Sequence, residues 1–123
     1  MENGYLLISD LDGTLLGDDE ALFQFAQWYE PRREHLRLVY NSGRLVRSVL
    51  ASIESTDLPE PDAIIGGVGT QIQCFKSKQP IGLWPMTGNG WEPLRICSIL
   101  ADYDELELQP DQFLSDHKIS YFA

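Results

Sequence analysis

Two aspartates separated by one residue, Asp10 and Asp12, directly follow a continuous apolar run, and they are the side chains best suited to chemistry in this sequence. In an extended segment residues i and i+2 point the same way, so both carboxylates are expected to face one cavity. Crowded carboxylates need a cation, and Mg²⁺ takes oxygen ligands, usually one or two carboxylates with waters and phosphate oxygens. We therefore predict that Asp10 and Asp12 hold Mg²⁺. In that setting Asp10 would form an aspartyl-phosphate, and Asp12 would protonate the leaving oxygen and later activate water.

The residues after this pair support a turn beside the carboxylates. Gly13 permits a tight turn, and the hydroxyl of Thr14 is suited to steady that turn, the nucleophile or a bound phosphate. A calcium loop of the EF-hand type shares the Asp-x-Asp spacing, but it requires other residues at Thr14, Leu15 and Ala21. An ordinary aspartate-rich turn after a strand is the remaining alternative.

A second group of interest, Ser42-Gly43-Arg44, follows another apolar run. We predict that this group opens a helix, where free N–H groups and the helix dipole attract an anion. Ser42, Gly43 and Arg44 are therefore candidates for phosphate binding. The alternative is a serine that caps a helix beside a surface arginine.

The elements that must position these groups alternate between strand and helix. Apolar runs predict buried strands over residues 5–9, 36–40 and 63–66. Helical spacing of apolar residues predicts one helix over residues 22–29, before a break at Pro31, and a second helix over residues 45–53. The fold class is therefore α/β, a Rossmann-like parallel sheet, in which ligands bind beyond the carboxyl ends of the strands.

The later sequence carries weaker signals. We expect a hairpin from residues 71–75 and 82–84, a helix from an Asn89–Glu92 capping pair to about Leu106, a linker over residues 109–116 and a strand over residues 118–122. Residues 67–70 suit either a phosphate loop or a simple turn. The three tryptophans, at positions 28, 84 and 91, are expected to pack rather than to stack on a sugar.

Composition limits the partners of this chain. Its 19 acidic and 9 basic residues give a net charge of −10, which opposes binding to nucleic acid and to anionic membranes. Cys74 and Cys97 lack metal-ligand spacing and are expected to be reduced packing residues. The apolar run before Asp10 is too short for a signal peptide or a membrane span, so we expect a cytoplasmic protein.

Four blocks of sequence, ISDLDGTLL, VYNSGR, GVGTQI and HKISYF, occur in an order and at intervals that resemble the haloacid dehalogenase-type phosphatase superfamily. The first block is specific for the superfamily. The last two point to its sucrose-phosphate phosphatase branch in plants and cyanobacteria.

The resemblance implies a role for several residues. It makes Asp10 the nucleophile, Asp12 the acid and base, and Ser42 a phosphate ligand, and it makes Lys118 a candidate contact to the sugar in a cap module. It also implies a division into an incomplete phosphatase core, residues 1–108, and a linker with the start of the cap, residues 109–123. A later lysine and an acidic pair that the family uses are absent, so we expect the chain to be a fragment with little or no activity of its own.

Three hypotheses about function follow from these observations. The first is a Mg²⁺-dependent phosphatase for a sugar phosphate, with sucrose 6-phosphate as the leading substrate. The second keeps the phosphoryl chemistry but changes the reaction, as in phosphomutases or mannosyl-phosphoglycerate phosphatases. The third is a non-catalytic domain that binds a partner enzyme, for which a sugar-phosphate synthase is a candidate.

Overall fold

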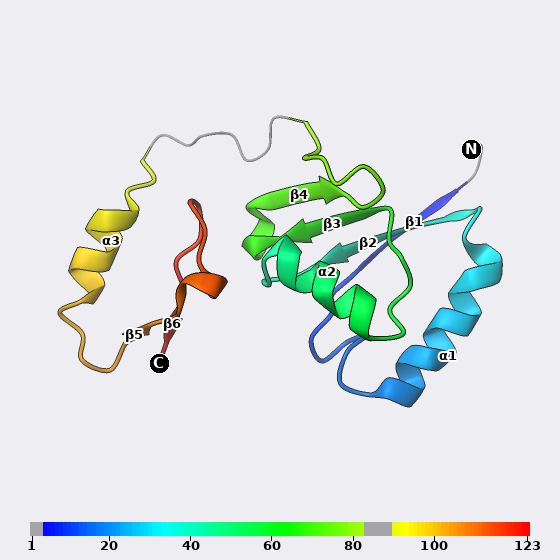
Figure 1. Cartoon of the computed structure of the whole chain (residues 1–123), viewed down its shortest axis with the longest axis horizontal. Helices are drawn as coiled ribbons and strands as arrows, with labels where there is room; N and C mark the ends of the chain where they lie inside the picture. The colour runs from blue at the N-terminus through cyan, green and yellow to red at the C-terminus, as the bar shows by residue number, and fades with distance from the viewer. Residues whose placement is uncertain (1–3, 83–89) are drawn as a thin grey trace.

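The computed structural model describes residues 4–82 and 90–123, and within them it contains a four-stranded sheet in the order β1-β2-β3-β4 (Figure 1). β1, β2 and β3 run parallel, and β4 is antiparallel to β3. The elements in chain order are β1 (Tyr5–Ser9), α1 (Asp19–Tyr29), the 3-10 turn η1 (Glu30–Arg32), β2 (Leu36–Asn41), α2 (Val46–Ser55), β3 (Ala63–Gly66), η2 (Gly67–Gly69), β4 (Gln71–Cys74), α3 (Pro93–Leu100), β5 (Glu107–Leu108), η3 (Asp111–Phe113) and β6 (Tyr121–Phe122). The predicted α/β class is confirmed.

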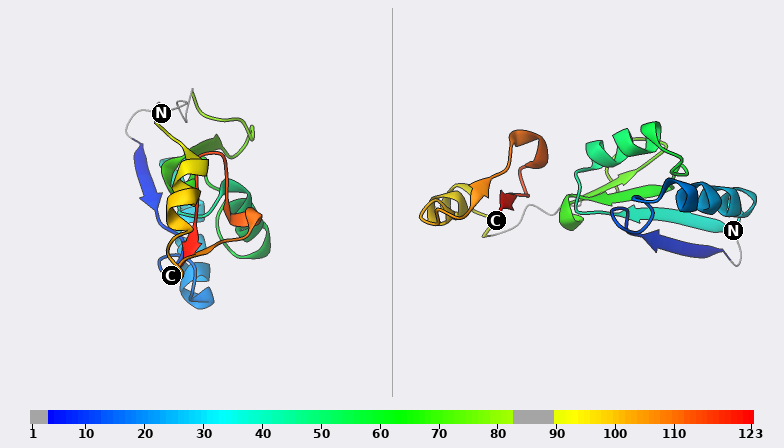
Figure 2. Two further views of the ribbon diagram at one scale, coloured as in Figure 1. Left: turned by 90° about the vertical axis from the view of Figure 1, so that its left-hand side faces the viewer. Right: turned by 90° about the horizontal axis from the view of Figure 1, so that it is seen from below.

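The helices begin and end where local chemistry dictates. Asp18 caps α1 by accepting a hydrogen bond from the backbone N–H of Ala21 at 3.0 Å, and Pro31 lies in the turn that follows the helix. Both α1 and α2 pack on the same face of the sheet (Figure 2). The core between them is built from fully buried residues of the strands, the helices and the first loop, among them Leu11, Leu38, Tyr40, Val49 and Ile64.

The second helix starts later than the sequence predicted. Ser42 does not open it, because α2 begins at Val46 after Leu45, which has an extended backbone. The Ser42 hydroxyl instead accepts from the backbone N–H of Arg44 at 3.0 Å, which folds a short turn before the helix. The N–H of Val46 donates to the side chain of Gln71 at 2.9 Å. This cap comes from a distant strand, so the local sequence did not reveal it.

The later elements are shorter than predicted. α3 ends at Leu100 and not near Leu106, since the acidic residues that follow, Asp102, Asp104 and Glu105, oppose the negative end of a helix. The strand predicted over residues 118–122 is reduced to β6, which pairs with β5. Residues 67–70 form the turn between β3 and β4 and lie outside the lining of the cavity described below. The predicted hairpin partner at residues 83 and 84 and the proposed cap at Asn89 lie outside the described residues.

The C-terminal segment forms a small unit of its own beside the sheet (Figure 1). Within it, the indole N–H of Trp91 donates to the carbonyl of Asp116 at 2.5 Å. One guanidinium nitrogen of Arg47, in α2, donates to the carbonyls of Asp111 at 3.3 Å and Gln112 at 2.6 Å. These contacts hold η3 over the first turn of α2. The division at residue 108 stays a prediction, and the pairing of β5 with β6 joins residues on both sides of it.

Candidate active site

The loop after β1 turns both aspartates outward because the residue between them is buried. Leu11 is fully buried in the core, and its carbonyl accepts from the backbone N–H groups of Thr14, Leu15 and Leu16 at 2.8 to 3.1 Å. Asp10 and Asp12 therefore lie on the solvent side of this anchor and are exposed. Gly13 takes a φ of +72°, a conformation that favours glycine, in the tight turn that follows.

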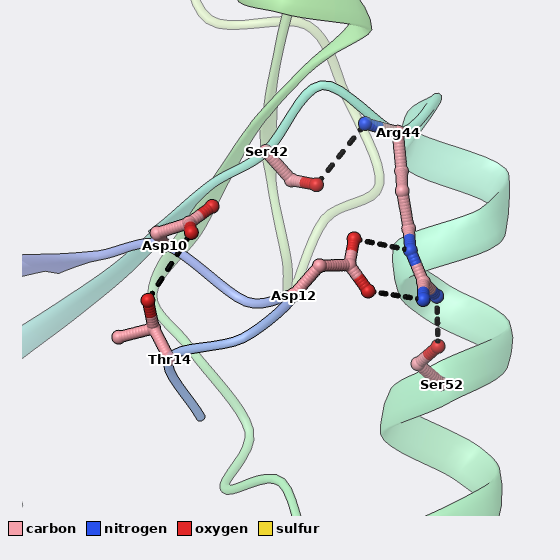
Figure 3. Close-up of polar contacts among 6 residues, drawn as sticks. All are labelled: Asp10, Asp12, Thr14, Ser42, Arg44 and Ser52. Atoms are coloured by element: carbon pink, nitrogen blue, oxygen red, sulfur yellow. Dashed lines mark hydrogen bonds and ion pairs between the residues drawn. The ribbon is translucent and has the colours of Figure 1, made fainter. Parts of the chain in front are cut away.

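Asp10 is held by a neighbour in its own loop. The hydroxyl of Thr14 donates to Oδ2 of Asp10 at 3.2 Å (Figure 3), so the predicted contact between Thr14 and Asp10 is present. Thr14 is not among the residues that line the cavity. Its direct role in binding phosphate stays a prediction.

Asp12 is paired with Arg44 across 32 residues of sequence. The Nε and Nη2 atoms of Arg44 donate to the two carboxylate oxygens of Asp12 at 2.8 and 2.5 Å, and Nη1 donates to the hydroxyl of Ser52 at 2.8 Å (Figure 3). Such two-point contacts between arginine and carboxylate are stronger and more directional than single ones. Arg44 thus joins the first loop to α2, and its guanidinium faces Asp12.

Ser42 lies where β2 ends, next to the end of β1. The strands pair in register from Tyr5 with Leu36 to Ser9 with Tyr40, which brings the segments that follow them to the same edge. The N–H of Ser42 donates to the carbonyl of Ile65 at 2.8 Å, and the residue is 4% exposed. The turn that carries Ser42 is therefore fixed to β3 as well as to β2.

One cavity of about 900 Å³ brings together residues that the sequence placed in two separate groups. Asp10, Asp12, Ser42, Gly43 and Arg44 line it from the sheet, and Lys118 lines it from the C-terminal segment. The remaining lining residues were not predicted; they are Leu45, Arg47, Ser48, Gln109, Gln112 and Phe113. Arg47 and Ser48 could have been suspected, since they follow the Ser42-Gly43-Arg44 motif at the start of a helix. The glutamines lie in a segment whose position only the tertiary fold sets.

Lys118 is tied to its own segment. Its ammonium group donates to the carbonyl of Phe113 at 2.7 Å and also to the hydroxyl of Ser120. Burial lowers the pKa of Lys118 from its ordinary value. The residue therefore places a partly buried ammonium group at the cavity wall.

The donor set suits Mg²⁺ in part. Asp10 offers a carboxylate with only the Thr14 hydroxyl as a partner among the described residues, whereas both oxygens of Asp12 are occupied by Arg44. Within residues 4–82 and 90–123 no three or more His, Cys, Asp or Glu side chains gather in a metal-binding group. Mg²⁺ commonly relies on one or two protein carboxylates with water and phosphate oxygens, so Asp10 fits this ion. The assignment of Asp12 as a second ligand stays a prediction.

This mostly parallel sheet, with an aspartate pair after the first strand and a serine turn after the second, defines a haloacid dehalogenase-type fold. The crystal structure of the sucrose-phosphatase from Synechocystis sp. PCC6803, in complex with sucrose and phosphate, superposes with a TM-score of 0.83 at 30% identity. The match covers 98% of this chain and 49% of that one. The sequence also matches the family model described as sucrose-6F-phosphate phosphohydrolase over residues 3–123. The chain belongs to this family.

Two curated relatives extend the comparison. The mannosylfructose-phosphate phosphatase of Agrobacterium fabrum is 37% identical over 120 residues, which are 95% of this chain and 48% of the relative. The glucosylglycerol-phosphate synthase of Pseudomonas anguilliseptica is 39% identical over 90 residues, 65% of this chain and 12% of that protein. The chain thus spans about half the length of the phosphatases that it resembles. None of its described helices has the length and apolar character needed to cross a membrane.

Proposed function

We propose that this chain carries the nucleophile half of a phosphatase that hydrolyses a sugar phosphate. The observation that carries the proposal is the meeting of Asp10, Asp12 and Ser42 in one cavity at the carboxyl ends of β1 and β2. Ligands of parallel α/β sheets bind at this edge. The family match and the named phosphatases among the relatives support the same reaction class.

Asp10 is the nucleophile in this proposal. Thr14 holds Oδ2, which leaves Oδ1 to attack phosphorus while the bond to the sugar oxygen breaks. Water then attacks the aspartyl-phosphate, breaks the bond between Oδ1 and phosphorus, and releases inorganic phosphate. Ser42 and the turn that holds it would orient the phosphoryl oxygens during both steps.

Asp12 transfers the protons. It would give a proton to the leaving sugar oxygen and then take one from the attacking water. In the structure both of its oxygens accept from Arg44, an arrangement that suits a carboxylate and not a proton donor. We infer that the side chain turns away from Arg44 during the reaction, and that Arg44 holds it in position between turnovers.

Mg²⁺ is the proposed cofactor, with Asp10 as a ligand. When bound, it would offset the negative charge of the phosphoryl group and of the carboxylate that approaches it. The remaining ligands would come from Asp12, water and phosphate oxygens.

The proposed substrate is sucrose 6-phosphate or a closely related disaccharide phosphate that contains fructose. The family description names sucrose, and the Agrobacterium relative is named for mannosylfructose phosphate, so the two share a fructose unit. A cavity of about 900 Å³ has room for a ligand of this size. Gln109, Gln112 and Lys118, on the wall opposite the aspartates, offer groups that bind sugar hydroxyls.

The test separates phosphoryl chemistry from substrate choice. Beryllium fluoride mimics a phosphoryl group on an aspartate, so ¹⁹F NMR of the chain with Mg²⁺ should show a bound signal that Asp10→Asn removes. The same signal in Asp10→Asn would refute the role of Asp10. Phosphate release should then be measured from sucrose 6-phosphate, mannosylfructose phosphate and glucose 6-phosphate. Rates that exceed the background and are equal on all three would refute the disaccharide specificity.

A sugar-phosphate synthase is a proposed partner. The match to part of a glucosylglycerol-phosphate synthase supports the association of this kind of domain with the enzyme that makes its substrate. Co-purification of the chain with a sucrose-phosphate synthase, compared with an unrelated glycosyltransferase, tests the proposal. Equal recovery of both enzymes would contradict it.

A further inference from the structure

The loop between β3 and β4 holds a valine in a strained backbone conformation. Gly67, Val68 and Gly69 have positive φ values of 57°, 58° and 85°. This left-handed region suits the two glycines, but it is rare for valine, because the branched side chain crowds the backbone there. Such strain persists only where the surrounding structure fixes it, and it is concentrated near functional sites. A glycine at position 68 would take the same conformation at little cost, so what valine adds is its side chain.

That side chain gains little from burial, because Val68 is 73% exposed. Its Cγ2 methyl group faces Gly43, since a Cβ atom on that glycine would lie 3.9 Å from it. A β-branched side chain is stiff at χ1, so the methyl group has a fixed place. Gly43 lines the cavity and lies in the turn of residues 42–44, which we call the serine turn. Val68 therefore limits the space into which the glycine of the serine turn can move.

The loop that carries Val68 is also hydrogen-bonded to the serine turn. The N–H of Gly67 donates to the carbonyl of Arg44 at 2.7 Å. The hydroxyl and the N–H of Thr70 donate to the carbonyl of Gly67 at 2.7 and 3.2 Å, which closes the loop around Val68. The serine turn is thus held by the backbone and by a side chain of this one loop.

We propose that Val68 is a positioning residue, which keeps the serine turn ordered before a ligand binds. The proposal rests on the phosphate-binding role that the proposed function gives to this turn. A turn that is ordered in advance loses less backbone freedom when phosphate binds, so the affinity is higher. The strain at Val68 lowers the stability of the chain. The residue therefore favours an ordered site over maximal stability.

Val68→Gly removes both the strain and the methyl group, and its first effects are measured without a ligand. The thermal midpoint should rise by about 3 °C or more, because the strain is relieved. The ¹⁵N order parameter of the Gly43 amide should fall from about 0.85 to about 0.6, because the serine turn moves more freely. A valine that only stabilised the fold would give a lower midpoint in the variant. A lower midpoint, or unchanged order at Gly43, overturns the proposal.

Beryllium fluoride with Mg²⁺ probes the site, and ¹⁹F NMR titration gives its affinity. Val68→Gly should weaken binding about fivefold, the effect of ordering one more backbone residue when the ligand binds. Equal affinity in Val68→Gly and the unchanged chain overturns the proposal. If the unchanged chain shows no bound signal, the phosphatase proposal fails. The order of Gly43 in the two chains then still decides whether Val68 holds the serine turn.

Two further variants at position 68 separate the methyl contact from the strain. Val68→Ile keeps the branched side chain and Cγ2, so its affinity should stay within about twofold of the unchanged chain. Val68→Ala keeps a side chain in the left-handed region but lacks Cγ2. It should weaken binding as much as Val68→Gly does, with a smaller rise in the thermal midpoint. Undiminished binding in Val68→Ala would refute the role of the methyl group.

Lys78→Gly is the control for strain relief alone. Lys78 is the other non-glycine residue with a positive φ, 59°, in the described ranges. It follows Cys74, which pairs with Ala63 at the end of β3 remote from Gly66 and the serine turn. Lys78→Gly should leave the order of Gly43 and the affinity for beryllium fluoride unchanged. Equal losses in Lys78→Gly and Val68→Gly would show that the effect is not specific to Val68 and would refute the proposal.

Discussion

Gly66, at the end of β3, packs against the turn that carries Ser42 and Arg44, and its replacement by alanine tests how that turn is held. A Cβ atom at this position would lie 2.9 Å from the carbonyl oxygen of Arg44 and 2.9 Å from both the backbone nitrogen and Cγ2 of Val46. Two of these atoms are backbone and cannot rotate away. Ordinary contact begins near 3.4 Å, so the turn and the strand must separate by about 0.5 Å (3.4 minus 2.9). The φ of Gly66, −125°, suits alanine, so the cost comes from packing alone.

The expected loss in the free energy of unfolding for Gly66→Ala is about 1–3 kcal/mol, the usual range for overpacking. Gly43→Ala is the matched control, because its Cβ would meet only Val68 Cγ2 at 3.9 Å. Both changes restrict the unfolded chain alike, so their difference isolates the contact. Urea denaturation gives the free energies, and the amide chemical shift of Val46 should move more in Gly66→Ala than in Gly43→Ala. If the two variants agree within about 0.5 kcal/mol, the packing argument is wrong.

Three further predictions concern the core, the alkaline stability and the position of the C-terminal segment. Leu38→Ala, at a fully buried position, should lower the free energy of unfolding measured in urea by about 2–5 kcal/mol. Leu94→Ala, at an 86% exposed position, should change it by less than about 0.5 kcal/mol. Similar losses in the two variants would contradict the assigned core. Burial raises the pKa of the Tyr40 hydroxyl above its ordinary 10.0, so its contribution to stability is complete below pH 10 and is lost as the pH rises above that value. Tyr40→Phe should therefore weaken the decline in unfolding free energy between pH 9 and about 11. At neutral pH the same change should cost about 1–3 kcal/mol, because the carbonyl of Pro59 loses its hydrogen-bond donor. An unchanged decline in Tyr40→Phe would contradict the role of burial. Arg47→Ala removes the donor to the carbonyls of Asp111 and Gln112, so hydrogen exchange in the C-terminal segment should become faster while the four-stranded sheet stays folded. If the segment exchanges as slowly in the variant as in the unchanged chain, other contacts hold it in place.

The first half of the fold could be read from local patterns, since its strands are short apolar runs that end at polar residues. β1 and β3 have the predicted bounds, and β2 extends one residue further than predicted. The start of α2 could not be read in this way, because Gln71 from β4 occupies the N–H of Val46 and the Ser42 hydroxyl stabilises a turn before the helix. The end of α3 was predicted too late because apolar spacing continues past Leu100. The acidic residues that follow would lie in the last turn of a longer helix, where negative charge is unfavourable, so the helix stops before them.

The sequence by itself determined that Asp10 and Asp12 both face outward, because a buried residue between two aspartates in an extended segment turns both away from the core. It also determined that Ser42 reaches the same edge, since parallel strands joined by a right-handed crossover end together. Only the tertiary structure decided that Arg44 pairs with Asp12 and that Gln109, Gln112 and Lys118 line the same cavity as the two aspartates. Those contacts join residues far apart in the chain, and their geometry depends on how the packed elements place side chains that no local pattern links.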